Sequence, residues 1–290
     1  MFFLLAIIST IAYSLQSSLL VKHARSMDKL SLAFYRMLSL SVVLLPLLLG
    51  VDQHDYQQLA PLTPNLMLSG LCGGLFLWTQ FYALKFIAVG VATSLNQSAR
   101  TLVAFILGFV LLEQSVASVQ AVLVLAVLSG GALVAISKNS MPHLQGSPLQ
   151  GIVVSILGGC LGAVTFYILS SASKQANPFM IGYFWELSIF FGACCILILR
   201  YLFTGVALER ISRRDFIGIA AASSPTLIGT ATAALALKSG PLAIFVSIAS
   251  LSVILSALFA RLLYAERLRS MQWLGILISL TGVIGLKIFS

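Results

Sequence analysis

Acidic side chains are scarce in this 290-residue sequence, which contains eight Asp and Glu residues against 17 Lys and Arg. Charged residues make up 9% of the chain, whereas soluble globular proteins contain roughly 25%. So little charge could not solvate the surface of a soluble protein of this size. The sequence also offers no two carboxylates close enough for general acid–base chemistry, so we do not expect an enzyme.

Metal-binding and disulfide patterns are missing as well. The three histidines show no metal spacing, and no HExxH motif occurs. The four cysteines all fall within apolar stretches, where we read them as small buried hydrophobic residues: Cys72, Cys160, Cys194 and Cys195. We therefore expect no metal, no catalytic residues and no cofactor, with a coupled proton as the one alternative.

Hydrophobic residues are abundant, at 59% of the chain, and the mean hydropathy is +1.04. A bilayer is crossed by about 20 apolar residues in a helix. Ten such spans are predicted, at residues 2–21, 32–50, 66–86, 90–111, 117–136, 150–170, 179–201, 215–236, 241–263 and 271–288. The fold class is therefore an all-α polytopic membrane protein, with the lipid bilayer as a partner and no nucleic acid.

The two halves of the sequence repeat each other. Ala-Leu-Lys ending at Lys85 is followed 28 residues later by Glu113, and Ala-Leu-Lys ending at Lys238 is followed at the same distance by Glu266. Each Glu leads into another apolar segment. A repeat of this kind in an apolar chain is typical of transporters, in which two similar halves surround a site near the middle of the membrane.

Basic residues are unevenly distributed between the loops. One side of the predicted bundle carries only Lys174, Lys238 and Lys287. The other side carries twelve, namely Lys22, Arg25, Lys29, Lys85, Lys138, Arg200, Arg210, Arg213, Arg214, Arg261, Arg267 and Arg269. The positive-inside rule places this second group in the cytoplasm and both termini outside. We expect a multi-pass protein of a bacterial inner (plasma) membrane, present as a monomer or homodimer.

Motifs in several spans resemble the drug/metabolite transporter superfamily, EamA type. They are Phe34-Tyr35-Arg36, Asn177-Pro178 followed by Trp185, and Glu266-Arg267 followed by Trp273-Leu274-Gly275. The resemblance covers nearly the whole chain and implies two inverted five-helix repeats, at residues 1–140 and 147–290, around a central cavity. It also implies export or exchange of small metabolites. The family usually has cytoplasmic termini, opposite to the orientation that the loop charges predict here.

A fixed positive charge lies deep in the predicted span 90–111, where relatives often have a proline. Arg100 is about ten residues from each end, too far to reach the membrane surface easily. It continues a polar stripe at helical spacing, formed by Thr93, Asn96 and Gln97. A guanidinium beside amides suits a carboxylate or phosphate, so we predict that these four residues bind substrate.

Glu186 is the only acid well inside a predicted span. Its burial makes it a candidate for proton coupling. A structural ion pair between Glu186 and Arg100 is the alternative to substrate binding by Arg100, and the two roles are compatible. Arg36 lies on the basic side of its span and is expected to reach the interface or a neighbouring helix.

The other candidate site residues are uncharged. Tyr13, Gln16 and Ser17 form a polar stripe in the first span, and Trp78 and Tyr82 supply an aromatic wall in the third. Pro225 interrupts the eighth span and is a gating candidate.

Pairs of glycines spaced four apart predict close helix packing. They are Gly70 with Gly74 and Gly158 with Gly162.

Taken together, these features predict a secondary transporter that exports or exchanges a small carboxylate-bearing, amino-acid-like metabolite by alternating access. Arg100 would hold the carboxylate, and Trp78 and Tyr82 would contact the apolar part. Two alternatives stay open, an exchanger of sugar phosphates or nucleotide sugars and a multidrug or lipid-linked flippase. A channel or a structural scaffold would lack saturable, stereoselective flux.

Overall fold

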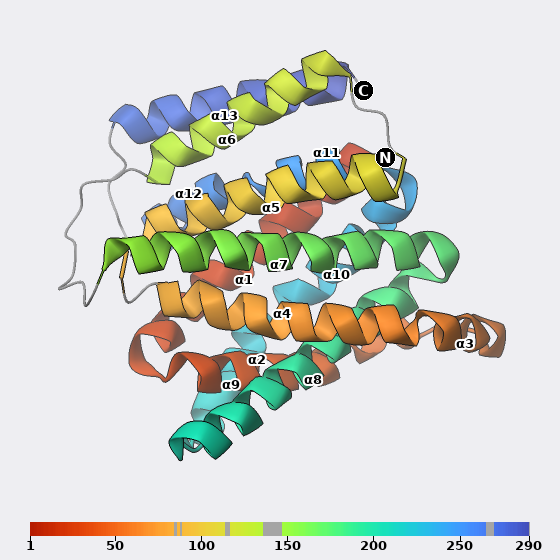
Figure 1. Ribbon diagram of the computed structural model, residues 1–290, viewed down its shortest axis with the longest axis vertical. Helices are drawn as coiled ribbons and strands as arrows, with labels where there is room; N and C mark the ends of the chain where they lie inside the picture. The colour runs from red at the N-terminus through yellow and green to blue at the C-terminus, as the bar shows by residue number, and fades with distance from the viewer. Residues whose placement is uncertain (84–85, 88, 114–116, 136–146, 265–269, 290) are drawn as a thin grey trace.

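A computed structural model describes residues 1–83, 86–87, 89–113, 117–135, 147–264 and 270–289. Within these ranges every regular element is a helix, and the helices lie side by side in a bundle (Figure 1). They are α1 (Phe2–Ser26), α2 (Lys29–Val43), η1 (Leu45–Leu48), α3 (Gln53–Leu59), η2 (Ala60–Leu62), α4 (Thr63–Ala83), α5 (Val89–Leu111), α6 (Ser118–Ala135), α7 (Pro148–Gln175), α8 (Pro178–Thr204), α9 (Arg213–Ser223), α10 (Pro225–Ser239), α11 (Leu242–Ala249), α12 (Ser252–Tyr264) and α13 (Ser270–Ile288).

Each of the ten predicted spans corresponds to one helix or to two consecutive helices, with ends shifted by a few residues. In the described ranges, seven helical segments are long and apolar enough to cross a membrane. Three shorter apolar segments, Ser118–Leu133, Leu242–Ser256 and Trp273–Ile288, complete the set of ten. The prediction of an all-α membrane fold is confirmed.

One helix lies where the hydropathy predicted only a loop. The segment between α2 and α4 contains the short polar helix α3, whose first turn is held by a capping box. The Asp52 side chain accepts from the backbone of Asp55, and Asp55 Oδ2 in turn accepts from the Asp52 amide at 3.2 Å. The two aspartates three residues apart are the sequence signal for this helix start.

Two of the spans are each divided into two α-helices. α9 ends at Ser223 and α10 begins at Pro225, which has no N–H to continue the helical ladder, so the predicted interruption is present. A second interruption separates α11 from α12 at residues 250–251 and was not predicted, because no proline marks it. There the Ser250 hydroxyl donates to the Ser247 carbonyl at 2.6 Å.

The main helix contacts run between the two halves of the chain. α1 packs along α10 and α12, α4 packs against α7 and α8, α5 against α7, and α6 against α13. The last of these pairs forms one edge of the bundle in Figure 1. Within the repeat, the pair α1–α10 is the counterpart of the pair α7–α4. The interface between the halves therefore extends through the whole bundle.

Glycines allow α4 and α8 to approach each other closely. A Cβ on Gly70 would lie 2.6 Å from the carbonyl carbon of Ser188, and a Cβ on Gly74 would lie 2.6 Å from that of Gly192. The predicted close packing at this glycine pair is confirmed. On α7, a Cβ on Gly158 would lie 2.6 Å from the Thr79 hydroxyl and one on Gly162 would lie 3.2 Å from Cδ of Arg100, so this pair is also a packing face.

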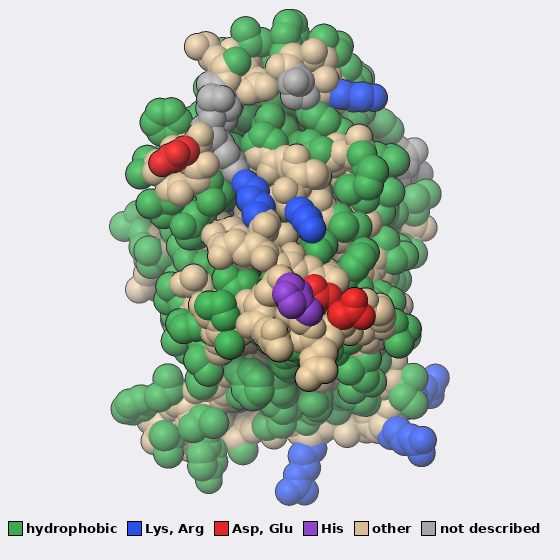
Figure 2. Space-filling model, turned by 90° about the vertical axis from the view of Figure 1, so that its right-hand side faces the viewer, with side chains coloured by type: hydrophobic (Ala, Val, Ile, Leu, Met, Phe, Trp, Pro, Cys, Tyr) green, Lys and Arg blue, Asp and Glu red, His purple; other side chains and the backbone are tan. Residues whose placement is uncertain are grey.

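Large hydrophobic side chains remain exposed on the outside of the bundle, as expected where hydrocarbon replaces water. Examples on α8 are Phe191, Leu199, Leu202 and Phe203. In the space-filling view, hydrophobic side chains cover the rim of the molecule and most charged ones lie nearer the middle of the face or at its lower edge (Figure 2). The apolar surface and the internal packing together suit a protein immersed in a bilayer.

Candidate functional site

The Arg100 side chain lies between two aromatic rings in the middle of α5. Its guanidinium carbon is 5.8 Å from the ring centre of Phe76 on α4 and 5.2 Å from that of Phe166 on α7. Its Nε is buried and has no hydrogen-bond partner. In the described part of the chain, Arg100 forms no ion pair, and its guanidinium contacts these two aromatic rings.

Glu186 does not pair with Arg100, so the structural ion pair left open by the sequence is not formed among the described residues. Glu186 is 4% exposed, on α8. Its Oε1 accepts from the Thr230 hydroxyl at 3.1 Å and from the Tyr13 hydroxyl at 3.4 Å. The two hydroxyl oxygens are themselves 2.8 Å apart. Tyr13, Glu186 and Thr230, which we name the Glu186 cluster, join α1, α8 and α10.

A second guanidinium lies beside this cluster. Arg36 on α2 is partly buried, and its Nη2 is 3.5 Å from the side-chain amide oxygen of Gln16 on α1. When the oxygen and nitrogen of the Gln16 side-chain amide exchange places, both Nε and Nη2 of Arg36 donate to the Gln16 oxygen. Glu186 is the acid whose negative charge, when it is ionised, acts on Arg36. The contact with Gln16 agrees with the interhelical role expected for Arg36, but it places the guanidinium inside the bundle.

Asn96 and Gln97 make contacts with the protein itself. The Asn96 amide nitrogen donates to the Ser155 carbonyl on α7 at 3.4 Å. Gln97 Nε2 donates to the Ala249 carbonyl at 3.1 Å and to the Ser252 hydroxyl at 3.0 Å. Gln97 thus satisfies a carbonyl that the interruption between α11 and α12 releases from its helix. Its Oε1 is buried without a partner.

The remaining predicted residues fall in different surroundings. Trp78 and Tyr82 stack on each other on α4, with ring centres 5.2 Å apart, and Tyr82 also meets the edge of Phe86. Thr93 is partly buried on α5, whereas Ser17 on α1 is exposed. The structure thus gathers Tyr13 and Gln16 beside Glu186 and Arg36, and it places Ser17 on another face of α1.

The interruption at Pro225 lies close to the contact between α1 and α10. One turn after the proline, the Gly229 carbonyl accepts from the Ser9 hydroxyl at 2.9 Å. A Cβ at Gly229 would lie 3.3 Å from the Tyr13 ring. The start of α10 is therefore tied to α1 by a hydrogen bond and a close contact, next to the Glu186 cluster.

Two pockets open elsewhere in the described structure. The larger, of about 260 Å³, lies between α3, the end of α7, the start of α8 and the end of α10. Its polar lining comes from Asp55, Gln58, Lys174, Gln175, Asn177 and Lys238. Figure 2 faces this end of the bundle, where basic and acidic side chains lie close together. The smaller, of about 10 Å³, borders Gln97, and Arg100 lines neither of them.

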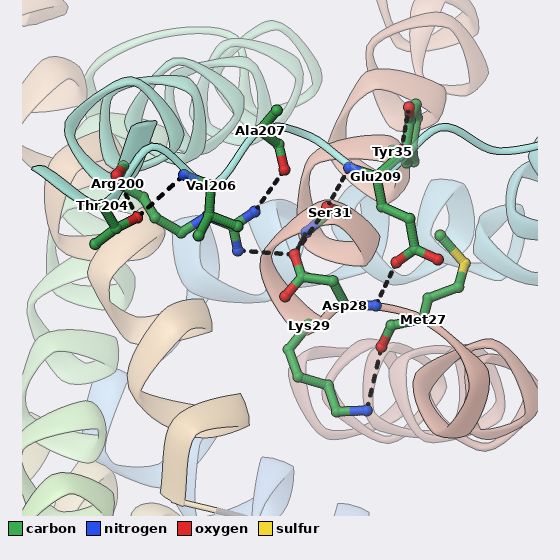
Figure 3. Close-up of polar contacts among 10 residues, drawn as sticks. All are labelled: Met27, Asp28, Lys29, Ser31, Tyr35, Arg200, Thr204, Val206, Ala207 and Glu209. Carbon is green, nitrogen blue, oxygen red and sulfur yellow. Dashed lines mark hydrogen bonds and ion pairs between the residues drawn. The ribbon is translucent and has the colours of Figure 1, made fainter. Parts of the chain in front are cut away.

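At the opposite end of the bundle lies a polar network around Asp28, the residue before α2 (Figure 3). Asp28 Oδ2 accepts from Arg200 Nη1 at 2.8 Å and from the Ser31 amide at 2.9 Å. The Asp28 amide donates to Glu209 Oε2 at 2.6 Å, and the Tyr35 hydroxyl donates to the Glu209 carbonyl at 2.8 Å. This Asp28–Arg200 network joins the first half of the chain to the end of α8 and the loop after it.

The Asp28–Arg200 network should make the free energy of unfolding depend on pH. Partial burial opposes ionisation of Asp28, but hydrogen bonds from Arg200 and Ser31 outweigh it and hold the pKa of the carboxyl below its usual value. The stabilisation is complete above the unfolded pKa of about 3.9 and is lost as the pH falls through the lower folded pKa. Because the pair is partly exposed, we expect Asp28→Asn to cost less than about 1 kcal/mol at neutral pH.

This effect can be measured by thermal unfolding of the detergent-purified protein between neutral pH and acid. The difference between wild type and Asp28→Asn should shrink towards zero at the acid end. Glu113→Gln is the matched control, because it removes the charge of a carboxylate that is exposed just after α5. A difference that is unchanged by acid would contradict an ionic contribution from Asp28.

Sequence reasoning missed several members of the site. Thr230 and Phe166 gave no signal beyond an isolated hydroxyl and an isolated ring within apolar spans. Arg36 was expected to reach the interface or a neighbouring helix, and its place beside the Glu186 cluster was not predicted. Two residues of the repeat motif, Lys85 and Glu266, lie outside the described residues.

Comparisons with known proteins agree with the fold. The sequence model of the EamA-like transporter family matches residues 1–136 and 149–288, one match in each half. None of the curated proteins matches the sequence. Among solved structures, one described only as a crystal structure of a protein superimposes with a TM-score of 0.75 at 12% identity, over 99% of this chain and 96% of its own. The chain belongs to the EamA-like transporter family and is a multi-pass membrane transporter.

Proposed function

We propose that this transporter moves a small metabolite that carries a carboxylate, and that Arg100 binds that group. The observation that carries the proposal is the Arg100 guanidinium deep in α5, between Phe76 and Phe166, with no acid paired to it in the described chain. A fixed charge within a membrane span is costly to desolvate, so such a charge usually marks a functional site. A planar carboxylate fits the guanidinium with two parallel hydrogen bonds.

The way the two halves pack supports alternating access. The most extensive helix contacts run between the first half and the second, so one half can rock against the other around Arg100. The pocket beside Lys174 lies at one end of this interface, and the Asp28–Arg200 network lies at the other. The interruption at Pro225 gives the chain between these two ends a point at which it can bend.

The substrate class can be tested by thermal stabilisation of the detergent-purified protein with metabolites sorted by charge. A ligand present at 100 times its dissociation constant adds about 2.7 kcal/mol to stability. We expect carboxylates that resemble amino acids to stabilise the protein more than neutral or cationic compounds of equal size. Stabilisation by cations and neutral amphipaths alone would contradict the proposal and favour a multidrug or lipid-linked flippase.

An exchanger of sugar phosphates or nucleotide sugars is the second candidate, and the position of Arg36 favours it. A phosphate carries more charge than a carboxylate, and Arg36 supplies a second guanidinium inside the bundle. The negative charge of ionised Glu186 offsets the positive charge of Arg36. The same panel separates the two candidates, because the phosphate hypothesis predicts that phosphate esters stabilise more than carboxylates.

Orientation in the membrane is a further prediction, for a bacterial inner membrane. Among the described residues, Lys22, Arg200 and Arg213 lie at the same end of the bundle, and by the positive-inside rule this end faces the cytoplasm. A periplasmic enzyme reporter fused after Ser290 should then be active. A cytoplasmic reporter that is active at this position would instead show the usual family orientation, with both termini inside.

A further inference from the structure

The Glu186 cluster contains a buried carboxylate that has hydroxyl partners and no ion pair in the described structure. Glu186 is 4% exposed and Thr230 is fully buried. The Thr230 hydroxyl donates to Glu186 Oε1 at 3.1 Å, and the Tyr13 hydroxyl lies 3.4 Å from the same oxygen. A buried carboxylate that no cation touches costs several kcal/mol, and proton uptake removes that cost.

The cluster lies on the interface between the two halves. Tyr13 belongs to the first half, and Glu186 and Thr230 belong to the second. Close by, the Ser9 hydroxyl bonds the Gly229 carbonyl across the same interface at 2.9 Å. A change in the charge of Glu186 therefore alters hydrogen bonds between the parts that must move against each other.

The groups that face Glu186 come from three neighbouring helices. Tyr13 approaches from α1, Arg36 from α2 and Thr230 from α10. The faces of α4 and α7 that pack on α8 present Gly70, Gly74 and the Thr165 carbonyl, which accepts from Trp185. Arg36 is the charge that acts on Glu186 in the described chain, and its hydrogen bond goes to Gln16.

We propose that Glu186 is a reversible proton-binding site whose proton changes the bonds between the two halves. A proton from the aqueous phase would bind a carboxylate oxygen of Glu186 and return to water later in the cycle. The ionised carboxylate only accepts hydrogen bonds, whereas the protonated acid has an O–H to donate. Protonation at Oε1, the oxygen that accepts from both hydroxyls, therefore reverses the direction of the bond to Tyr13 or to Thr230.

A proton fits this cluster better than a metal cation does. Hard cations such as Ca²⁺ need six to eight oxygen ligands. The cluster offers the three side chains Tyr13, Glu186 and Thr230, whose oxygens lie at hydrogen-bond distances from one another. The nearby guanidinium of Arg36 would also repel a bound cation.

Proton binding at Glu186 also changes the charge available to an anion. With Glu186 protonated, Arg36 loses the acid that acts on it, and both Arg36 and Arg100 can attract a negative ligand. By linkage, an anion would then favour protonation to the same degree. This last step rests on the proposed function, whereas the proton site itself needs no substrate.

The proton site can be tested without a substrate by infrared difference spectroscopy of the purified protein during a pH titration. The wild type should show the C=O stretch of a protonated acid that is missing from Glu186→Gln and retained in the exposed control Glu113→Gln. The same band in Glu186→Gln would overturn the proposal. So would a wild-type spectrum in which no band depends on Glu186.

A second variant keeps the carboxylate and changes one partner. Tyr13→Phe removes the hydroxyl that lies 3.4 Å from Glu186 Oε1, so the midpoint of the Glu186 band should move relative to the wild type. Titrations in sodium and in choline buffers should give the same midpoint. An unmoved midpoint in Tyr13→Phe, or a sodium-dependent midpoint in the wild type, would contradict a proton site in this cluster.

Discussion

Arg100→Gln is expected to abolish the stabilisation that a carboxylate ligand gives to the purified transporter. Removing one partner of a buried charged contact costs about 2–5 kcal/mol, which is a loss of roughly 30-fold or more in affinity. Without ligand, the variant should unfold at the same temperature as the wild type or higher, since Arg100 has no acid partner in the described chain. The measurement is thermal unfolding with and without each carboxylate of the panel.

Arg200→Gln is the control for this experiment. It removes a guanidinium from the Asp28–Arg200 network, at the end of the bundle, and should leave ligand stabilisation unchanged. If carboxylates stabilise Arg100→Gln as well as they stabilise the wild type, Arg100 is not the anion site. If instead the ligand-free variant is strongly destabilised, the contacts of Arg100 with Phe76 and Phe166 are its main role.

Gly192→Ala is expected to destabilise the fold strongly, although it adds a single methyl group. A Cβ at Gly192 would overlap the carbonyl oxygen of Gly70, which is backbone and cannot turn away. α4 and α8 would have to separate along their whole contact. We expect a loss of about 3 kcal/mol, at the upper end of the usual cost of overpacking, measured by thermal unfolding in detergent.

Gly131→Ala is the matched control, because a Cβ at Gly131 would meet nothing within 4 Å. It should leave stability unchanged or raise it slightly, since alanine favours the helix more than glycine does. Equal effects of the two substitutions would show that the close contact between α4 and α8 does not limit stability.

The positions of the spans could be predicted because they depend on local sequence. A helix in a bilayer must be apolar over about 20 residues, and this requirement is visible in any window of the chain. The interruption at Pro225 was likewise visible, since a proline lacks the N–H that a helix needs. The interruption at residues 250–251 had no such marker. The residue that donates to its released carbonyl is Gln97, which belongs to a distant helix.

The candidate site was predicted only in part. The stripe of Asn96, Gln97 and Arg100 was found from helical spacing, but spacing does not say which neighbour each side chain meets. In the structure, Asn96 bonds α7, Gln97 bonds the interruption after α11, and Arg100 lies between aromatic rings. Asn96 and Arg100 therefore both face α7, whereas Gln97 faces the interruption after α11.

By itself, the sequence determined that this is a membrane protein of ten spans and two repeated halves, because hydropathy and periodicity are properties of each segment alone. The tertiary structure alone decided that Glu186 meets Tyr13 and Thr230, that Arg36 turns inward, and that Arg100 has no acid beside it in the described chain. The physical reason is that each helix rotates about its axis until its small residues meet those of its neighbours. That rotation depends on helices far away in the chain, and it selects which polar side chains share the interior.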